Sequence, residues 1–246
     1  MKPLFAYFTD VHGNIDALQA VMDDARQCGT DRFICGGDMV GIGPFTNEVL
    51  ETLFNMPTIQ MVTGNHDEAV LALKLGRTHP ESHNHAKKHH QWIADQLKDT
   101  YADKLSKLPR QLEFEEENFR FLIMHYPFKN GKKESPISED PFMPIISKPD
   151  TASMKELFGH ALPYHFVAFG HHHIVHDFKI SHTHFVNPGA LGCNRKAEAR
   201  YALAYAANQE LQVEFKSVPY DRTNLFKAYR EQQVPDGPFL MNAFHS

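Results

Sequence analysis

The chain has 246 residues, a length typical of one large domain or two small ones. Hydrophobic residues make up 42% and charged residues 22%, which excludes disordered and fibrous classes of protein. Acidic side chains outnumber basic ones by 30 to 25, so the formal charge is -5. Because proteins that bind the nucleic-acid backbone usually carry a basic excess, we do not expect binding to nucleic-acid duplexes.

No apolar run of the sequence approaches the ~20 residues that cross a bilayer, and the N-terminus lacks the apolar core of a signal peptide. The three cysteines, Cys28, Cys35 and Cys193, form no CxxC pair, so we expect reduced, packed thiols. These features lead us to expect a cytoplasmic protein with no membrane partner.

The first third of the chain alternates strand and helix patterns. Apolar runs predict strands over 4–9, 33–35 and 58–62, and helical apolar spacing predicts helices over 15–28 and 45–55. Alternation of this kind is typical of a parallel sheet with right-handed crossovers.

The remaining two thirds begin with a polar, helical segment over 68–107, which we interpret as a cap-like insertion. Short strands are then predicted over 111–115, 120–125, 165–170, 174–180, 184–187, 200–206 and 211–217. We expect a long loop over 130–149, a helix over 221–231 and an irregular tail from 235. No linker divides the chain, so we predict a single α/β domain over 1–246 with the helical insertion over 68–107.

Histidine is unusually frequent, with 17 residues, and several histidines, acids and amides follow predicted strands. Asp10 and His12 follow the first strand, Asp38 the second, and Asn65 and His66 the third. A regular βαβ repeat brings these residues to the carboxyl edge of the sheet, where open α/β sheets bind ligands. Asp10 and His12 are two residues apart, so in an extended segment their side chains share one face.

The second half of the chain adds three more histidines after strand-like runs. His125 ends one predicted strand, and His171 and His173 follow another with the same spacing of two residues. Carboxylate, amide and imidazole ligands in this mix suit manganese, iron or zinc rather than a thiolate site. Neighbouring strands lie ~4.8 Å apart, which is compatible with two metal ions ~3.5–4 Å apart.

Five short blocks stand in a characteristic order: D-x-H, G-D, G-N-H-[DE], a lone His and G-H-x-H. Here they occupy residues 10–12, 37–38, 64–67, 125 and 170–173. With these blocks the chain resembles the calcineurin-like metallophosphoesterases, and residues 38–44 and 187–192 resemble the small bacterial phosphodiesterase-like branch. The resemblance implies a four-layer α/β/β/α sandwich that holds two divalent transition metal ions, either manganese, iron, zinc or nickel.

The resemblance also implies roles for the polar side chains of the blocks. Seven side chains would bind metal: Asp10, His12 and His173 at one ion, Asn65, His125 and His171 at the other, and Asp38 bridging both. His66 would be the catalytic residue, protonating the leaving oxygen or stabilising its charge, while a metal-bridging hydroxide attacks the phosphorus.

This chemistry predicts a dinuclear metal-dependent phosphoesterase that prefers phosphodiesters and takes a small phosphorylated substrate, with nucleotides among the candidates. In Ser/Thr protein phosphatases the second block continues Asp-Arg-Gly, and the arginine grips the phosphate. This chain has Gly41-Ile42-Gly43 instead, which argues against a protein phosphatase. A phosphomonoesterase, a nucleotide pyrophosphohydrolase and a catalytically silent scaffold with the same fold remain as alternatives.

The polar helical segment carries a cluster of surplus histidines, His79, His83, His85, His89 and His90. We expect them on a solvated helix face, although His85 and His89, four residues apart, have the spacing to bind a metal or a substrate phosphate.

Three residues within or next to the blocks have simpler interpretations. His172, between two predicted ligands, is expected to point to the opposite face and pack. Tyr126 is expected to pack rather than to narrow the pocket. Asp67 is expected to cap the helix that follows rather than to orient His66.

Overall fold

The computed structural model describes residues 2–161, 163–207 and 210–246. Its strands, in chain order, are β1 (Phe5–Phe8), β2 (Phe33–Cys35), β3 (Ile59–Met61), β4 (Gln111–Glu116), β5 (Phe119–Met124), β6 (Phe166–Ala168), β7 (Val175–Ile180), β8 (Thr183–Pro188), β9 (Glu198–Ala207) and β10 (Glu210–Pro219). Its helices are α1 (Ile15–Gln27), α2 (Thr46–Phe54), α3 (Asn65–Lys74), α4 (Lys87–Gln96), α5 (Asp99–Leu105), α6 (Thr151–Phe158), α7 (Thr223–Glu231) and α8 (Gly237–His245), with short 3-10 turns η1 (Glu81–Ala86), η2 (Ile137–Glu139) and η3 (Gly159–Ala161).

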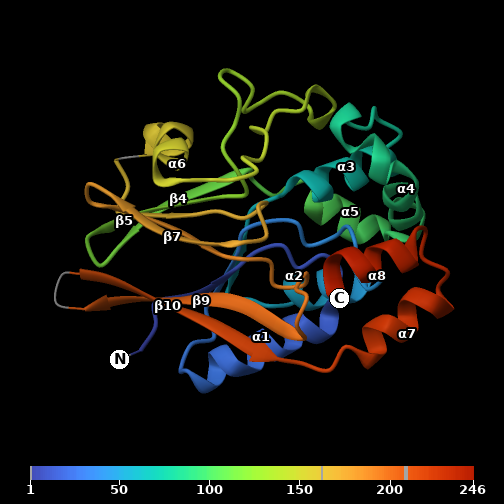
Figure 1. Cartoon of the computed structure of the whole chain (residues 1–246), viewed down its shortest axis with the longest axis horizontal. Coiled ribbons are helices and arrows are strands. Elements are labelled where there is room, and N and C mark those ends of the chain that lie inside the picture. Colours follow the sequence, from blue (N-terminus) through green and yellow to red (C-terminus); the bar gives the residue numbers. More distant parts are fainter. Residues whose placement is uncertain (1, 162, 208–209) are drawn as a thin grey trace.

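The strands form two mixed five-stranded sheets, in the orders β10-β9-β1-β2-β3 and β4-β5-β6-β8-β7. In the first sheet β1, β2 and β3 are parallel and form one side, while β9 pairs antiparallel with both β1 and β10. In the second sheet the parallel strands β5, β6 and β8 lie in the middle, and β4 and β7 are antiparallel edge strands. The sheets are stacked between helices, with α1 on one outer face and α6 on the other (Figure 1). The predicted four-layer α/β/β/α arrangement is therefore confirmed.

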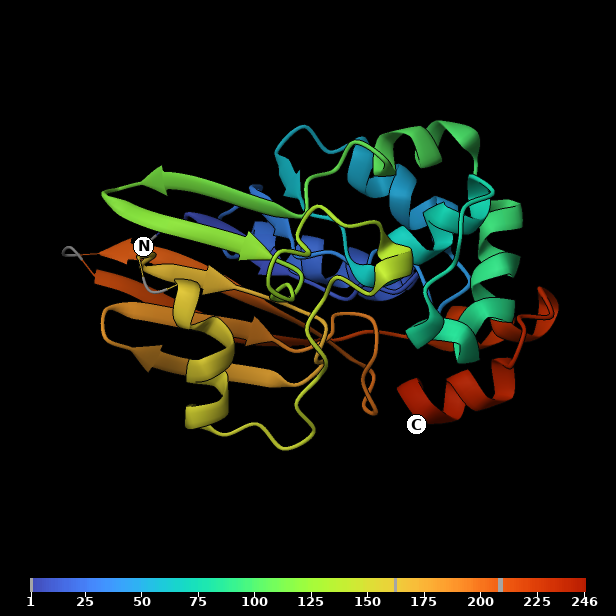
Figure 2. The same cartoon turned by 90° about the horizontal axis from the view of Figure 1, so that it is seen from above.

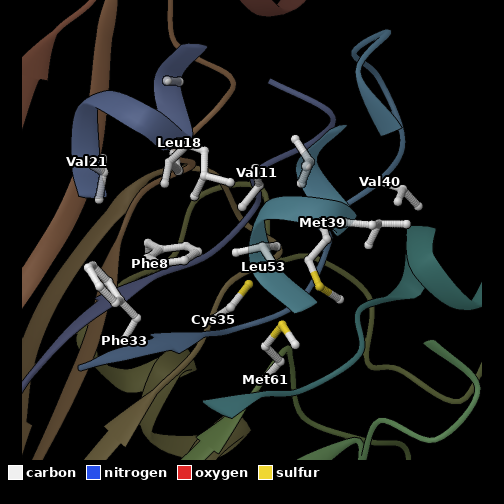
Figure 3. Close-up of a cluster of buried hydrophobic side chains, with 14 of the residues drawn as sticks. Phe8, Val11, Leu18, Val21, Phe33, Cys35, Met39, Val40, Leu53 and Met61 are labelled. Atoms are coloured by element: carbon white, nitrogen blue, oxygen red, sulfur yellow. The ribbon is translucent and has the colours of Figure 1, made fainter. Parts of the chain in front are cut away.

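Strand β1 shows how alternation in the sequence builds two cores. Phe5 and Tyr7 face the second sheet, where the Phe5 ring lies 5.5 Å from that of Phe121. Phe8 faces the other way and packs against Leu18 of α1 (Figure 3). Successive strand residues point to opposite faces, so one short apolar strand that is buried on both sides joins the layers.

The helices α3, α4, α5, α7 and α8 gather at one end of the molecule (Figures 1 and 2). Among the described residues, none of the helices combines the length and the hydropathy needed to cross a bilayer. The predicted strands are all present, and the segment over 68–107 contains helices, the first of which begins at Asn65.

The prediction of an irregular tail from 235 is wrong, because residues 237–245 form α8. Pro238 lies in its first turn, where a missing N–H costs nothing, and Leu240 is buried against α7. A further helix, α6, was not predicted, although Asp150 and Ser153 form a capping box at its start. Both helices are short, so their apolar periodicity is weak in the sequence.

Candidate metal centre

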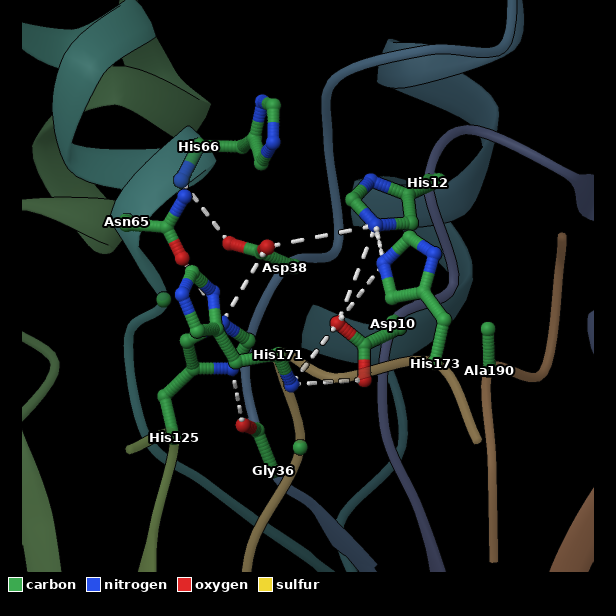
Figure 4. A network of polar contacts seen from close by, with 12 residues as sticks. Asp10, His12, Gly36, Asp38, Asn65, His66, His125, His171, His173 and Ala190 are labelled. Atoms are coloured by element: carbon green, nitrogen blue, oxygen red, sulfur yellow. Dashed lines mark hydrogen bonds and ion pairs between the residues drawn. The ribbon is translucent and has the colours of Figure 1, made fainter. Parts of the chain in front are cut away.

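The seven predicted metal ligands come from both sheets and converge at one point (Figure 4). They lie directly after β1 (Asp10 and His12), after β2 (Asp38), at the start of α3 (Asn65), after β5 (His125) and after β6 (His171 and His173). Most of these side chains are buried, and His171 and His173 are partly exposed. Buried polar groups at this density need mutual hydrogen bonds or a bound cation to offset the loss of water.

One half of the cluster is formed by Asp10, His12 and His173. The Nε2 atoms of His12 and His173 are 2.9 Å apart. Oδ1 of Asp10 lies 3.7 Å from the first of these nitrogens and 3.4 Å from the second. Two ligand atoms that bind one ion at ~2.1 Å and at right angles are about 3.0 Å apart. These three side chains therefore have the spacing of ligands to a single ion.

The other half is organised around Asp38. Its Oδ2 atom lies 3.2 Å from Nε2 of His125 and 3.9 Å from Nε2 of His12, so the carboxylate stands between the two halves. Nε2 of His125 is also 2.9 Å from Oδ1 of Asn65. A ring nitrogen of His171 completes a group with Asp38 and His125 whose ligand atoms all lie within 4.8 Å of one another.

Backbone carbonyls orient two of the histidine rings. Nδ1 of His12 lies 3.1 Å from the Val40 carbonyl oxygen, and Nδ1 of His125 lies 2.8 Å from that of Gly36. A carbonyl oxygen only accepts hydrogen bonds, so Nδ1 carries the proton in each ring. Nε2 then faces the centre, as it does in histidines that bind metal through that atom.

The ionisable groups of the cluster shift one another's pKa values. Burial favours the neutral ring of His125, but the adjacent Asp38 carboxylate outweighs burial and raises the pKa of His125 to about 9. Burial opposes the charged form of Asp38 too, yet His125 and His66 hold its pKa well below the usual value. For His12, burial and the nearby His173 lower the pKa to about 4. A proton on Nε2 of His125 therefore competes with a metal ion for the same position.

The surroundings of the Asp38 carboxylate also suit a bound cation. Oδ2 of Asp38 is buried and accepts no hydrogen bond of good geometry from any described residue. A buried carboxylate oxygen without such a partner is costly, and a cation removes that cost. The oxygen and imidazole nitrogen donors around it suit divalent transition metals.

Comparison with known proteins agrees with this geometry. Residues 4–209 match the family model of the calcineurin-like phosphoesterase superfamily domain. The chain belongs to this superfamily. Across 96% of both chains it is 25% identical to the uncharacterised protein MJ0912 of Methanocaldococcus jannaschii. The family assignment confirms the resemblance of the sequence blocks.

Two solved structures share the fold of this superfamily member. The hypothetical protein PH1004 of Pyrococcus horikoshii superposes with a TM-score of 0.80 at 18% identity, covering 98% of this chain and 97% of its own. A metallophosphoesterase of Sphaerobacter thermophilus superposes with a TM-score of 0.71 at 24% identity, covering 97% and 98%.

The phosphoesterase blocks impose a strained backbone. Asp10, His12, Asp38, His171 and His173 all have positive φ angles, between 48° and 67°. For residues other than glycine this conformation costs on the order of 1–3 kcal/mol each and is concentrated at functional sites. The positive φ angles direct these side chains toward the centre. Asp10 and His12 therefore both reach it, and so do His171 and His173.

The position before Asn65 requires a glycine, Gly64, because the backbone there passes very close to Asp38. A Cβ atom at this position would lie 2.1 Å from Oδ1 of Asp38. Asp67 accepts hydrogen bonds from the backbone N–H groups of Gly64 (2.9 Å) and Val40 (3.0 Å). It therefore caps the start of α3, as predicted, from the third helical position rather than from the N-cap position.

His66 lies beside the predicted metal ligands, but it belongs to no group of potential ligands among the described residues. Its backbone N–H donates to Oδ1 of Asp38 over 2.8 Å. Its ring uses Nδ1 to share a hydrogen bond with Nε2 of His90, also over 2.8 Å. Nδ1 of His90 in turn lies 2.9 Å from Nε2 of His79. Three imidazoles thus form a chain that ends at the centre.

The predicted solvated face is therefore wrong for His79, His89 and His90, which are all buried. The segment folds back over the centre, and helix α4 packs against α3. His83 also turns inward, with Nε2 2.8 Å from Nδ2 of Asn65, whereas His85 is exposed. Neither His85 nor His89 belongs to a group of three potential ligands in the part of the chain that is described.

The packing role predicted for Tyr126 agrees with the structure, whereas His172 lines a cavity over the centre together with His171 and His173 and so does not point away from it. Tyr126 is fully buried, and its ring packs 4.8 Å from that of His171, so it has a packing role. His172 pairs with His176 through ring nitrogens 2.9 Å apart.

Cys193 is a residue of the centre that the sequence did not reveal. The three cysteines are free thiols, and Sγ of Cys193 lies within 4.8 Å of ligand nitrogens of His12 and His173. Burial raises the pKa of its thiol well above the usual value, so it stays protonated. A lone cysteine outside any paired motif carries no signal that would place it here.

A cavity of about 730 Å³ opens over the centre. It is lined by Asp38, Asn65, His66, His171 and His173 from the ligand blocks, by histidines of η1 and α4, and by side chains of α8. A space of this size and position is what a small substrate needs in order to reach the ligands.

Proposed function

We propose that this chain is a dinuclear metal-dependent phosphodiesterase. The observation that carries the proposal is Oδ2 of Asp38, which is buried, lacks a well-formed hydrogen bond and stands between His12 and His125. One ion would be held by Asp10, His12 and His173, the other by Asn65, His125 and His171, and Asp38 would bridge them. The donor set favours manganese, iron, zinc or nickel.

The chain's own residues have separable tasks in this proposal. Two bound divalent cations supply a nucleophile from water and neutralise charge on the phosphate. His66 donates a hydrogen bond to the leaving oxygen through Nε2, because Nδ1 is already paired with His90 and burial holds the pKa of the ring well below its usual value. The strained strand ends hold the ligand atoms in place before the substrate arrives, which lowers the cost of reorganisation.

The charge of the cavity favours diesters. Two divalent ions against the carboxylates of Asp10 and Asp38 leave a net charge of about +2, which suits an anionic substrate. The described residues that line the cavity include no Lys or Arg, and Asp236 adds a negative charge. With Asp236 counted, the net charge of the cavity falls to about +1, which does not fully neutralise a monoester dianion or a polyphosphate. A small phosphodiester, with a single negative charge, fits best.

The test compares bis-p-nitrophenyl phosphate with p-nitrophenyl phosphate, using protein stripped with a chelator and then reloaded with manganese. We expect about two bound ions per chain and metal-dependent hydrolysis that favours the diester. Asp236→Asn, a change of a carboxylate in the same cavity, serves as the control and should keep both ions. A preference for the monoester would contradict the diester assignment, and metal binding without turnover of either ester would contradict catalysis.

A further inference from the structure

The cavity over the centre has an apolar wall that the proposed chemistry does not use. Its side chains are Ile42, Ile145, Phe239, Leu240 and Phe244, three of which belong to α8. The helix lies at the same end of the molecule as η1 and α4, which carry the histidines of the cavity (Figure 2). The wall therefore stands beside the reacting centre.

Two members of this wall are unusually exposed. Phe239 is 66% exposed and Ile145 is 46% exposed, and both belong to the small set of large apolar side chains that the described part of the chain leaves in solvent. Neighbouring exposed apolar groups that line one cavity commonly mark a ligand site. Leu240, the residue after Phe239, is buried, so α8 stays docked while it presents the Phe239 ring to the cavity.

The wall is continuous with the proposed metal ligands. The ring of Phe244 contacts that of His173 edge-to-face, with centroids 6.2 Å apart. A group attached to a phosphate at the centre is thus within reach of phenylalanine rings. Aromatic rings pack with other aromatic rings in offset or edge-to-face geometries that stabilise beyond the area they bury.

The same wall disfavours anionic substituents. Asp236, the residue before α8, lines the cavity together with Phe239, and the described lining residues include no Lys or Arg. A substrate tail with additional phosphates would face this carboxylate without a neutralising cation. The chemistry of the wall therefore favours a planar apolar group over an anionic one.

We propose that Phe239, Phe244 and Ile145 form a subsite for an uncharged aromatic ring carried by the phosphodiester substrate. This inference rests on the proposed function, because it assumes that the phosphate binds at the centre formed by Asp10, His12, Asp38 and their partners. It makes α8 a determinant of substrate choice.

The test uses two probes that mimic a diester and differ only in the ring, methyl phenylphosphonate and methyl methylphosphonate. Both are monoanions without a good leaving group, so affinity is measured apart from turnover. With the full-length, manganese-loaded protein in a calorimeter, we expect the phenyl probe to bind at least about tenfold more tightly. Phe239→Ala should reduce this ratio to below about threefold, and Phe239→Trp should preserve it.

The control is Leu75→Ala, which removes another exposed apolar side chain that is 44% exposed and lies at the end of α3, outside the lining of this cavity. It should leave the ratio unchanged. Equal affinity of the two probes in the unmodified protein, or a ratio that Phe239→Ala does not alter, would overturn the subsite. Failure of the proposed function would show differently, as an absence of diester hydrolysis even though the ring preference persists.

Discussion

Replacing His66 by alanine tests whether this ring acts on the substrate or on the metals. The ring's hydrogen bond in the structure runs to His90, and its nitrogens belong to no group of potential ligands among the described residues. The contact between His66 and Asp38 uses the backbone N–H, which alanine retains. His66→Ala should therefore keep both metal ions. Loss of a hydrogen-bond donor to the leaving oxygen lowers turnover by roughly 10²–10³, equivalent to about 3–4 kcal/mol of transition-state stabilisation.

The assay measures kcat/KM for a series of aryl phosphodiesters whose leaving phenols have increasing pKa values. A donor to the leaving oxygen matters most when that oxygen is a poor leaving group, so the loss caused by His66→Ala should grow along the series. Metal content is measured on the same samples by mass spectrometry. His85→Ala is the matched control, because His85 lines the same cavity but is exposed.

Two results would refute this reasoning. Loss of metal from His66→Ala would mean that the ring helps to hold an ion. A loss of activity that is equal for good and poor leaving groups would mean that the ring does not assist departure of the leaving oxygen.

Three further predictions follow from the centre. Asp38→Asn removes the charge shared by both halves, so metal content should fall together with activity; retention of both ions would contradict a bridging role. In metal-free protein, the pKa of His125, raised from 6.5 to about 9, stabilises the fold fully below pH 6.5, and this contribution is lost as pH rises through 9. Denaturant unfolding should show a loss of about 2 kcal/mol between pH 7 and pH 9, and His125→Asn should abolish this dependence. His90→Phe keeps a ring of similar shape but removes the hydrogen bond to His66. Activity should fall about tenfold with metal content unchanged. An unaltered rate would show that the hydrogen bond from His90 does not position the His66 ring.

The sequence by itself determined the strand-end positions and the residue types of the proposed ligands. Each block is a short local stretch, and β1 to β3 are apolar runs whose ends are visible without knowing their neighbours. A parallel repeat then requires Asp10, Asp38 and Asn65 to meet at one edge, because parallel strands share their carboxyl ends. The resemblance of the sequence blocks to a known family predicted that His125 and His171 join these residues from the second half of the chain.

Only the tertiary structure decided what surrounds those ligands. The pairing of His90 with His66, the approach of Cys193 to His12 and the apolar wall of α8 are contacts between elements far apart in the chain. Local periodicity reports which face of an element is apolar, but it does not report which element covers that face. A polar helical segment thus looked solvated, although it closes over the centre, and a short tail looked irregular, although it is held as a helix by packing against α7.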